Sequence, residues 1–120
     1  MLKWMFVASI CVPILGNAAS FDCKKASTSV EKMICSDAAL GRLDEALGEN
    51  YKMMMATNIG EGARADLKST QRQWVAQRNK CADAACVLAA YKKRVDEVCD
   101  YPAISGMHPT CKEADDIIAK

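Results

Sequence analysis

Cysteine is the residue type whose number and spacing in this sequence could support chemistry, either as a metal ligand or as a disulfide. Seven cysteines are present, and all but Cys11 lie beyond the first twenty residues. None of those six forms a CxxC pair, which disfavours a zinc site and a thioredoxin-type redox pair. In an oxidising compartment, an even number of cysteines predicts a disulfide framework instead. We expect no metal, no cofactor and no free thiol, with bridges formed by Cys23, Cys35, Cys81, Cys86, Cys99 and Cys111.

Other candidate catalytic groups do not form a recognisable set. His108 is the single histidine, so a His-rich zinc site is not expected. The acidic pairs Asp44-Glu45 and Asp96-Glu97 could suggest acid–base chemistry. Adjacent residues on a helix point about 100° apart, however, so solvated helix faces are the better interpretation. The sequence contains no glycine-rich phosphate loop. We therefore predict that the protein is not an enzyme.

The N-terminus supports export. Lys3 precedes an apolar run from Trp4 to Leu15, and Gly16-Asn17-Ala18-Ala19-Ser20 supplies small residues for a signal peptidase. The apolar run is shorter than the about 20 residues that span a bilayer. Cys23 follows Asp22 rather than a small residue, which disfavours a lipoprotein signal. We predict a signal peptide over residues 1–19, with cleavage after Ala18, Ala19 or Ser20, and a periplasmic or secreted protein without a membrane span.

Size and charge limit the remaining classes of function. About 100 residues follow the signal, which is enough for one compact domain. The whole chain has 16 basic and 15 acidic residues, and the signal removes only Lys3, so the mature chain has no net charge. A nucleic-acid-binding protein would be expected to show a basic stripe, so the charge balance argues against that class. We divide the chain into a helical domain over 20–98 and a tail over 99–120.

Hydrophobic spacing and capping residues predict helices. Thr28 and Glu31 fit a capping box, and Asp37 offers a second N-cap before an apolar stripe from Leu40 to Met54. A third helix is expected over 63–81, and a fourth begins after Asp83. The residues after Pro102 predict a loop or short irregular tail. The predicted fold is all-α, a small disulfide-stapled antiparallel bundle of about four helices.

The bundle restricts the disulfide pairing. The second and third helices should be antiparallel neighbours, which places Cys35 near Cys81 and Cys86. Cys99 lies thirteen residues beyond Cys86, roughly 20 Å along a helix. We therefore predict a local bridge between Cys99 and Cys111, and bridges from Cys23 and Cys35 to Cys81 and Cys86, with the partner of each left open.

A few residues on the apolar stripes are expected to form the core and a structural ion pair. Trp74 lies on the inner stripe of the third helix, while Tyr51 and Tyr91 lie on the stripes of the second and fourth. Arg78 shares the stripe of Trp74, and an unpaired charge buried there would be very costly. Asp44, beside Leu43, is its predicted partner.

The order of these residues resembles the LprI-type lysozyme-inhibitor N-terminal domain family. The resemblance begins at residues 21–28 and 31–37 and continues through Leu43-Asp44, Leu47 and Tyr51. It recurs at residues 71–74, and it reaches about residue 97. The further matching positions are Leu40, Arg78, Cys81, Cys86, Tyr91 and Arg94.

The resemblance implies a bacterial envelope protein that blocks a lysozyme or another peptidoglycan hydrolase by surface contact. It supplies no inhibitory residue that maps onto this chain, and the family motif has no counterpart for the tail between Cys99 and Cys111, where we expect individual specificity. Glu113, Asp115 and Asp116 are candidates for an acidic patch that would attract a basic lysozyme. Two alternatives are an immunity protein against an envelope toxin and a structural or stress-related envelope module without an enzymatic target. The oligomeric state is not predicted.

Overall fold

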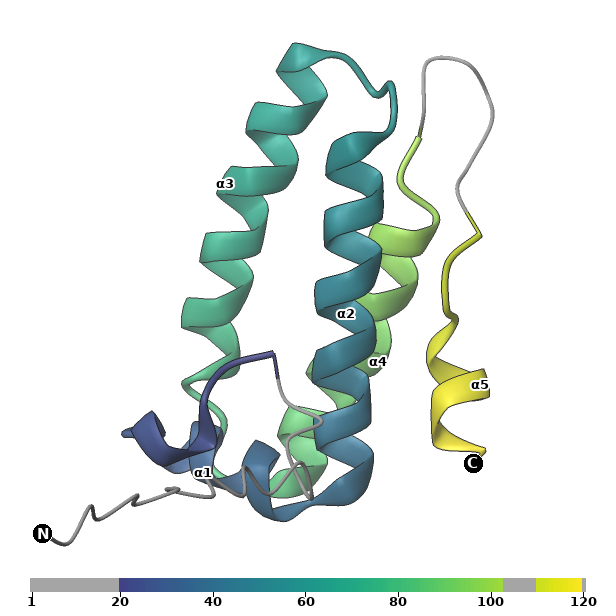
Figure 1. Ribbon diagram of the computed structural model, residues 1–120. Helices are drawn as coiled ribbons and strands as arrows, with labels where there is room; N and C mark the ends of the chain where they lie inside the picture. The colour runs from purple at the N-terminus through teal and green to yellow at the C-terminus, as the bar shows by residue number, and fades with distance from the viewer. Residues whose placement is uncertain (1–19, 103–109, 120) are drawn as a thin grey trace, which may run out of the picture.

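The computed structural model describes residues 20–102 and 110–119. All regular structure in these ranges is helical, which confirms the predicted fold class (Figure 1). The predicted signal peptide and His108 lie outside the described residues. The elements are η1 (Cys23–Lys25), α1 (Ser29–Ser36), α2 (Ala38–Ala56), α3 (Glu61–Arg78), α4 (Ala84–Cys99) and α5 (Ala114–Ile118).

The helix starts follow the capping residues in the sequence. Thr28 and Glu31 form the predicted capping box at α1, each side chain accepting from a free backbone N–H. Asp37 accepts from the first backbone N–H groups of α2, and Asp83 accepts from Cys86 at the start of α4. Gly60 has a positive φ of 89° before α3, a conformation that favours glycine. These local signals set the boundaries between the helices.

Helix α2 lies at the centre of the molecule. Helix α3 runs antiparallel to it, α4 packs along it, and α5 covers one side of the α2–α4 pair (Figure 1). None of the described helices is both long and apolar enough to cross a bilayer. The buried apolar core comes mainly from α1, α2 and α4: Val30, Ile34, Leu40, Leu43, Leu47, Met54, Val87, Tyr91, Val95 and Val98.

Helix α3 is less buried than its apolar positions predicted. Leu67 and Arg78 are buried, whereas Trp74 and Val75 are partly exposed. Polar contacts fix both ends of the helix. Near its start, the Arg64 guanidinium donates to the carbonyls of Met55 and Thr57, and near its end Arg78 faces the core.

The disulfides correct part of the predicted pairing. Cys99 and Cys111 form the predicted local bridge. The predicted bridges from Cys23 and Cys35 to Cys81 and Cys86 are wrong, because Cys23 pairs with Cys35 and Cys81 with Cys86.

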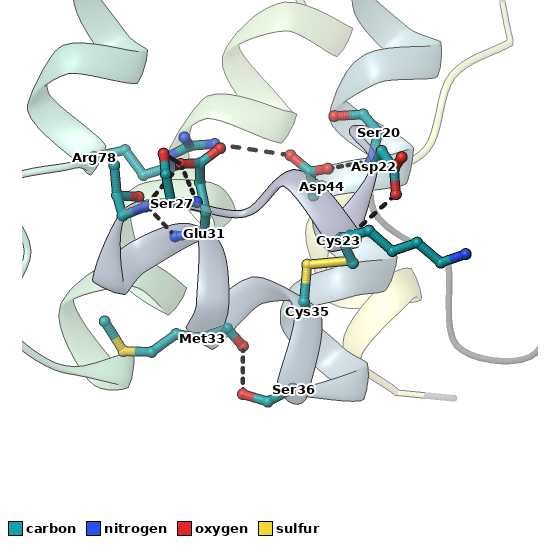
Figure 2. Close-up of a disulfide and its surroundings, with 12 residues drawn as sticks. Ser20, Asp22, Cys23, Ser27, Glu31, Met33, Cys35, Ser36, Asp44 and Arg78 are labelled. Carbon is teal, nitrogen blue, oxygen red and sulfur yellow. Dashed lines mark hydrogen bonds and ion pairs between the residues drawn. A yellow bond between two sulfur atoms is a disulfide. The ribbon is translucent and has the colours of Figure 1, made fainter.

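Chain reversals explain the two unexpected pairs. The η1 turn and α1 bring the Cα atoms of Cys23 and Cys35 to 5.8 Å (Figure 2). The turn between α3 and α4 brings those of Cys81 and Cys86 to 5.5 Å. Each bridge is therefore local in sequence, and none of the three joins α2 directly to α3.

Residues 110–119, the described part of the C-terminal segment, contain a helix where an irregular tail was predicted. Helix α5 buries Ala114 and Ile117 against α2 and α4. Asn50, buried on α2, donates to the carbonyls of Val95 and Lys112 and accepts from the backbone N–H of Lys112 over 3.0 Å. This amide fastens the segment after Cys111 onto the bundle. The division of the chain at residue 98 stays a prediction.

Candidate functional site

A buried polar network joins α2, α3 and α4. The Tyr91 hydroxyl donates to Asp44 Oδ1 over 2.7 Å and accepts from Arg78 Nη1 over 2.9 Å. Arg78 Nη1 lies 4.0 Å from the same carboxylate oxygen. Asp44 is 4% exposed, Arg78 7% and Tyr91 0%. The structure thus brings Asp44 and Arg78 together as an ion pair, with a tyrosine hydroxyl bonded to both partners.

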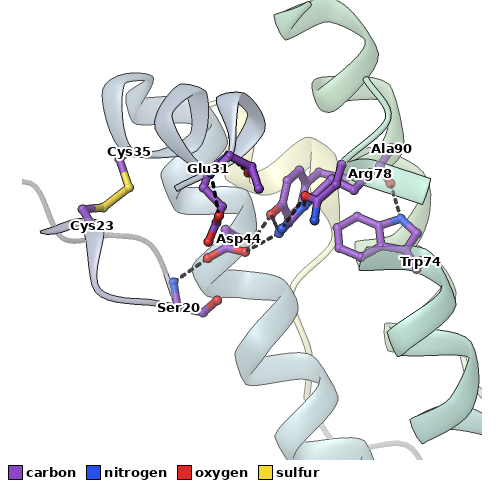
Figure 3. A network of polar contacts seen from close by, with 11 residues as sticks. Ser20, Cys23, Glu31, Cys35, Asp44, Trp74, Arg78 and Ala90 are labelled. Atoms are coloured by element: carbon purple, nitrogen blue, oxygen red, sulfur yellow. Dashed lines mark hydrogen bonds and ion pairs between the residues drawn. A yellow bond between two sulfur atoms is a disulfide. The ribbon is translucent and has the colours of Figure 1, made fainter. Parts of the chain in front are cut away.

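Trp74 covers the outer side of this network (Figure 3). Its ring meets Tyr91 edge to face at 4.9 Å between centroids, and the Arg78 guanidinium lies 5.7 Å from its centroid. The indole N–H donates to the carbonyl of Ala90. The remaining guanidinium donors of Arg78 reach the side chain of Asn79. The half-buried indole therefore shields the ion pair from water.

The second oxygen of Asp44 faces the N-terminal segment. Asp44 Oδ2 accepts a hydrogen bond from the backbone nitrogen of Ser20 (Figures 2 and 3). Both carboxylate oxygens are therefore engaged, by Tyr91 on one side and by Ser20 on the other. The network extends in this way from the helical core to the first described residue.

The chemistry of the network is structural. Burial, and then the negative charge of Asp44, raise the pKa of the Tyr91 hydroxyl far above its ordinary value, so it stays protonated. The Asp44 carboxylate and the Arg78 guanidinium are hydrogen-bonded to neighbouring protein groups. A general acid or base must reach a substrate proton, and these groups are turned toward one another instead. The arrangement connects α2, α3 and α4 through buried polar contacts.

An open hollow of about 670 Å³ lies where α3 meets the end of α4. Arg94, which is buried on α4, donates to the side chains of Gln71 and Thr70 on α3 and forms an ion pair with Glu97 at 3.4 Å. These bonds hold α3 beside α4. The hollow is lined by Asp66, Thr70, Lys93, Arg94, Asp96, Glu97, Asp100, Tyr101 and Pro102.

Carboxylates gather beside the Cys99–Cys111 bridge. We call Asp96, Asp100 and Glu113 the acidic end. A hydrogen bond with Asp96, followed by burial and the charge of Asp100, raises the pKa of Glu113 to about 7. Asp115 pairs with Lys92 at 3.9 Å across exposed side chains. Among the residues predicted to form an acidic patch, Glu113 therefore lies close to other carboxylates.

The same region contains a geometric grouping of metal-ligand types. Atoms of Cys99, Cys111 and Glu113 lie within 4.8 Å of one another. The two sulfurs are bonded to each other, so they are not available as thiolate ligands. The donor set left is one carboxylate, which does not fit a metal centre.

Some of these residues can be located from the sequence, and others cannot. Tyr51 packs against the core from a partly buried position. Asn50 and Arg94 were not assigned roles, although both are buried and link separate elements. Arg94 is one of the positions that match the family motif, and that match is the signal in the sequence that could indicate its importance. Asn50 is a polar residue within the stretch from Leu40 to Met54, and nothing in its spacing indicates a contact with Lys112, 62 positions away.

Comparison with known proteins identifies the family. The family model described as "Lysozyme inhibitor LprI" matches residues 23–108. The chain belongs to the LprI family. The matched residues contain the Cys23–Cys35 and Cys81–Cys86 disulfides and the network of Asp44, Tyr91 and Arg78. No solved structure matches this chain significantly.

Curated relatives match part of the chain. A protein named "Lipoprotein LprI" from Mycobacterium tuberculosis (strain ATCC 25618 / H37Rv) is 32% identical over 80 residues, covering 63% of this chain and 39% of that protein. Its namesake from Mycobacterium bovis matches with the same values. An uncharacterized protein, R02472, from Rhizobium meliloti is 29% identical over 85 residues, covering 61% of this chain and 58% of its own length. The chain thus spans 39% of the length of the mycobacterial relatives.

Proposed function

We propose that this protein is an exported, non-enzymatic inhibitor of a peptidoglycan muramidase. The observation that carries the proposal is the match of the lysozyme-inhibitor family model over residues 23–108, which includes α1 to α4. The inhibitor would act by surface contact. The buried side chains of Asp44, Arg78 and Tyr91 bind one another. Contact with a partner would therefore be made by residues on the surface, which supports this mode of action.

Export is the second part of the proposal. Residues 1–19 have the basic start, apolar run and small-residue exit of a signal peptide. The mycobacterial relatives are named lipoproteins. In this chain Asp22 directly precedes Cys23, and Cys23 is bonded to Cys35. We therefore propose a free periplasmic or secreted protein.

The segment closed by Cys99 and Cys111 is the proposed contact region. The bridge fixes its two ends, and Asn50 holds the backbone directly after it. A muramidase cleaves a glycosidic bond between two carboxyl groups in an open cleft, and an inhibitor that occupies this cleft blocks the enzyme without any chemistry of its own. The acidic end lies at the base of this segment. It would speed association with a basic muramidase through electrostatic steering.

Direct binding tests the proposal. The refolded protein should be measured against purified goose-, chicken- and invertebrate-type lysozymes by calorimetry, with a turbidity assay of cell-wall lysis in parallel. We expect submicromolar binding to at least one class and slower lysis by the same enzyme. Failure against all three classes would contradict lysozyme inhibition and would direct the search to an envelope toxin or another envelope partner.

A pair of charge variants tests the contact region. Asp100→Asn removes one negative charge at the acidic end, whereas Ala82→Lys adds one positive charge in the exposed turn before α4. The two positions are separated by the length of α4, about 24 Å. We expect Asp100→Asn to lower the association rate at low salt and Ala82→Lys to leave it nearly unchanged. Equal effects would place the contact elsewhere.

A further inference from the structure

The backbone nitrogen of Ser20 has a defined position on α2. It donates to Asp44 Oδ2, and Asp44 is itself buried (Figure 3). The other oxygen of this carboxylate accepts from Tyr91, while Arg78 Nη1 stands 4.0 Å away. Oδ2 therefore has the Ser20 nitrogen as its donor, and the charge carried by that nitrogen depends on where the signal is cleaved.

A glycine on α2 leaves space for Ser20 beside Asp44. Gly48 follows Asp44 by one helical turn and lies on the same face. A Cβ atom built on Gly48 would lie 3.4 Å from the Cβ of Ser20, so Ser20 rests directly over the bare helix surface. Phe21 packs against the core, and Cys23 is fixed to Cys35. The position of the Ser20 nitrogen is thus determined from both sides.

The three candidate cleavage points put different groups opposite Asp44. Cleavage after Ala18 leaves the Ser20 nitrogen as a neutral amide with one hydrogen. Cleavage after Ser20 removes this nitrogen from the protein. Cleavage after Ala19 hydrolyses the Ala19–Ser20 peptide bond: water supplies the hydroxyl of the new Ala19 carboxyl group and a hydrogen to the Ser20 amine, which takes up a proton near neutral pH.

We propose that the signal is cleaved between Ala19 and Ser20 and that the new Ser20 ammonium forms an ion pair with Asp44. The ammonium would replace a neutral donor by a charged one with three hydrogens, and hydrogen bonds to charged groups are stronger than neutral ones. Ser20 is exposed, so the new charge keeps contact with water while it binds the buried carboxylate. Processing would thereby lock the N-terminal segment onto α2. This inference rests on the proposed export and is independent of muramidase binding.

Intact mass gives the first test. The full precursor is expressed in a bacterial host, and the exported protein is purified and weighed by mass spectrometry. We expect a chain that begins at Ser20. A chain that begins at Ala19 or Phe21, or that retains the signal, would overturn the proposal whatever the lysozyme assays show.

Protein ligation at Cys23 gives the second test. A synthetic Ser20-Phe21-Asp22 thioester is joined to residues 23–120, once with a free amine and once acetylated, and both products are refolded oxidatively. We expect acetylation to raise the unfolding equilibrium constant about tenfold, as loss of a charged hydrogen bond would. Equal stability of the two products would overturn the proposal.

Two further variants test whether the effect of acetylation depends on Asp44. In the Asp44→Asn background, acetylation should change the unfolding constant less than about twofold, since the charged partner is gone. A product extended by Ala19 moves the ammonium away from Asp44, and it should lose as much stability as the acetylated chain. This extended product needs no core substitution, so it decides the question even if Asp44→Asn does not refold. An extended chain as stable as the free Ser20 chain would contradict the proposal.

Discussion

Tyr91 donates its hydroxyl hydrogen to Asp44 over 2.7 Å, and this bond connects α4 to α2 across 47 positions of sequence. The paired cysteines of the three disulfides are 12, 5 and 12 positions apart in the sequence, so each bridge closes a short local loop. A short loop restricts the unfolded chain less than a long one. The arrangement of α2, α3 and α4 therefore depends on core packing and on the polar network around Tyr91.

Tyr91→Phe should be costly although it changes one atom. It leaves Asp44 and Arg78 buried and removes the hydroxyl bonded to both, so we expect a loss of about 2–3 kcal/mol in the free energy of unfolding. Urea denaturation monitored by circular dichroism measures this. Tyr51→Phe, on the partly buried side of α2, is the matched control. Similar losses for the two variants would show that the network contributes little.

Asp44 and Arg78 should be energetically coupled. Either substitution alone, Asp44→Asn or Arg78→Met, leaves one buried charge without its partner. The double variant leaves neither, so its loss should be smaller than the sum of the single losses by about 1–3 kcal/mol. A double-mutant cycle of unfolding free energies gives this coupling directly. Additive losses would remove the ion pair as a source of stability.

Asn50→Ala should release the C-terminal segment. The amide makes three hydrogen bonds to backbone groups of Val95 and Lys112, and its loss leaves buried groups unsatisfied. We expect a loss of about 2 kcal/mol and faster hydrogen exchange at Lys112 and Ala114. Asn58→Ala, at an exposed position, is the control. Unchanged exchange at Lys112 would contradict the role of Asn50.

Trp74→Ala should cost less than truncation of a fully buried tryptophan. The indole is partly exposed, so we expect about 2–3 kcal/mol rather than the about 3–5 kcal/mol typical of a core position. Trp74→Phe keeps a ring against Tyr91 but removes the donor to Ala90, and it should cost less. Thermal denaturation compares the two variants. A loss below about 1 kcal/mol for Trp74→Ala would free this side chain for partner recognition.

Local signals in the sequence predicted the helices well. Thr28, Asp37 and Asp83 each satisfy free N–H groups within a few residues, so their roles depend on nearby atoms. The Asp44–Arg78 pairing could also be predicted, because a charge on an apolar stripe requires a partner. Tyr91 was assigned to the core, but its bridging hydroxyl depends on how α4 is rotated against α2.

Part of the predicted disulfide pairing and the predicted irregular tail were wrong because both depend on turns and tertiary contacts. Antiparallel packing of the helices indicates only that four cysteines lie at one end of the bundle. The two chain reversals determine which of the four form each disulfide. The reversals bring Cys23 to Cys35 and Cys81 to Cys86. Helix α5 has five residues, too few for a clear apolar period, so its burial against α2 and α4 depends on tertiary contacts.

Glu113 should make the stability of the protein fall as pH rises. Its pKa is raised from 4.5 to about 7 in the folded chain, first by the hydrogen bond with Asp96. The folded state therefore binds the proton more tightly than the unfolded state does. This contribution is complete below pH 4.5 and is lost as pH rises through about 7.

Glu113→Gln keeps a neutral hydrogen-bonding group at all pH values and should remove this slope. Water partly screens the repulsion from Asp96 and Asp100, so we expect the variant to be more stable than the wild type by about 1 kcal/mol at pH 8. The two proteins should be nearly equal at pH 4. Urea denaturation at pH 4, 6 and 8 measures the difference, with the exposed Glu45→Gln as control. A gain at pH 8 that does not shrink toward pH 4 would show that the carboxyl group of Glu113 is not the source of the pH dependence.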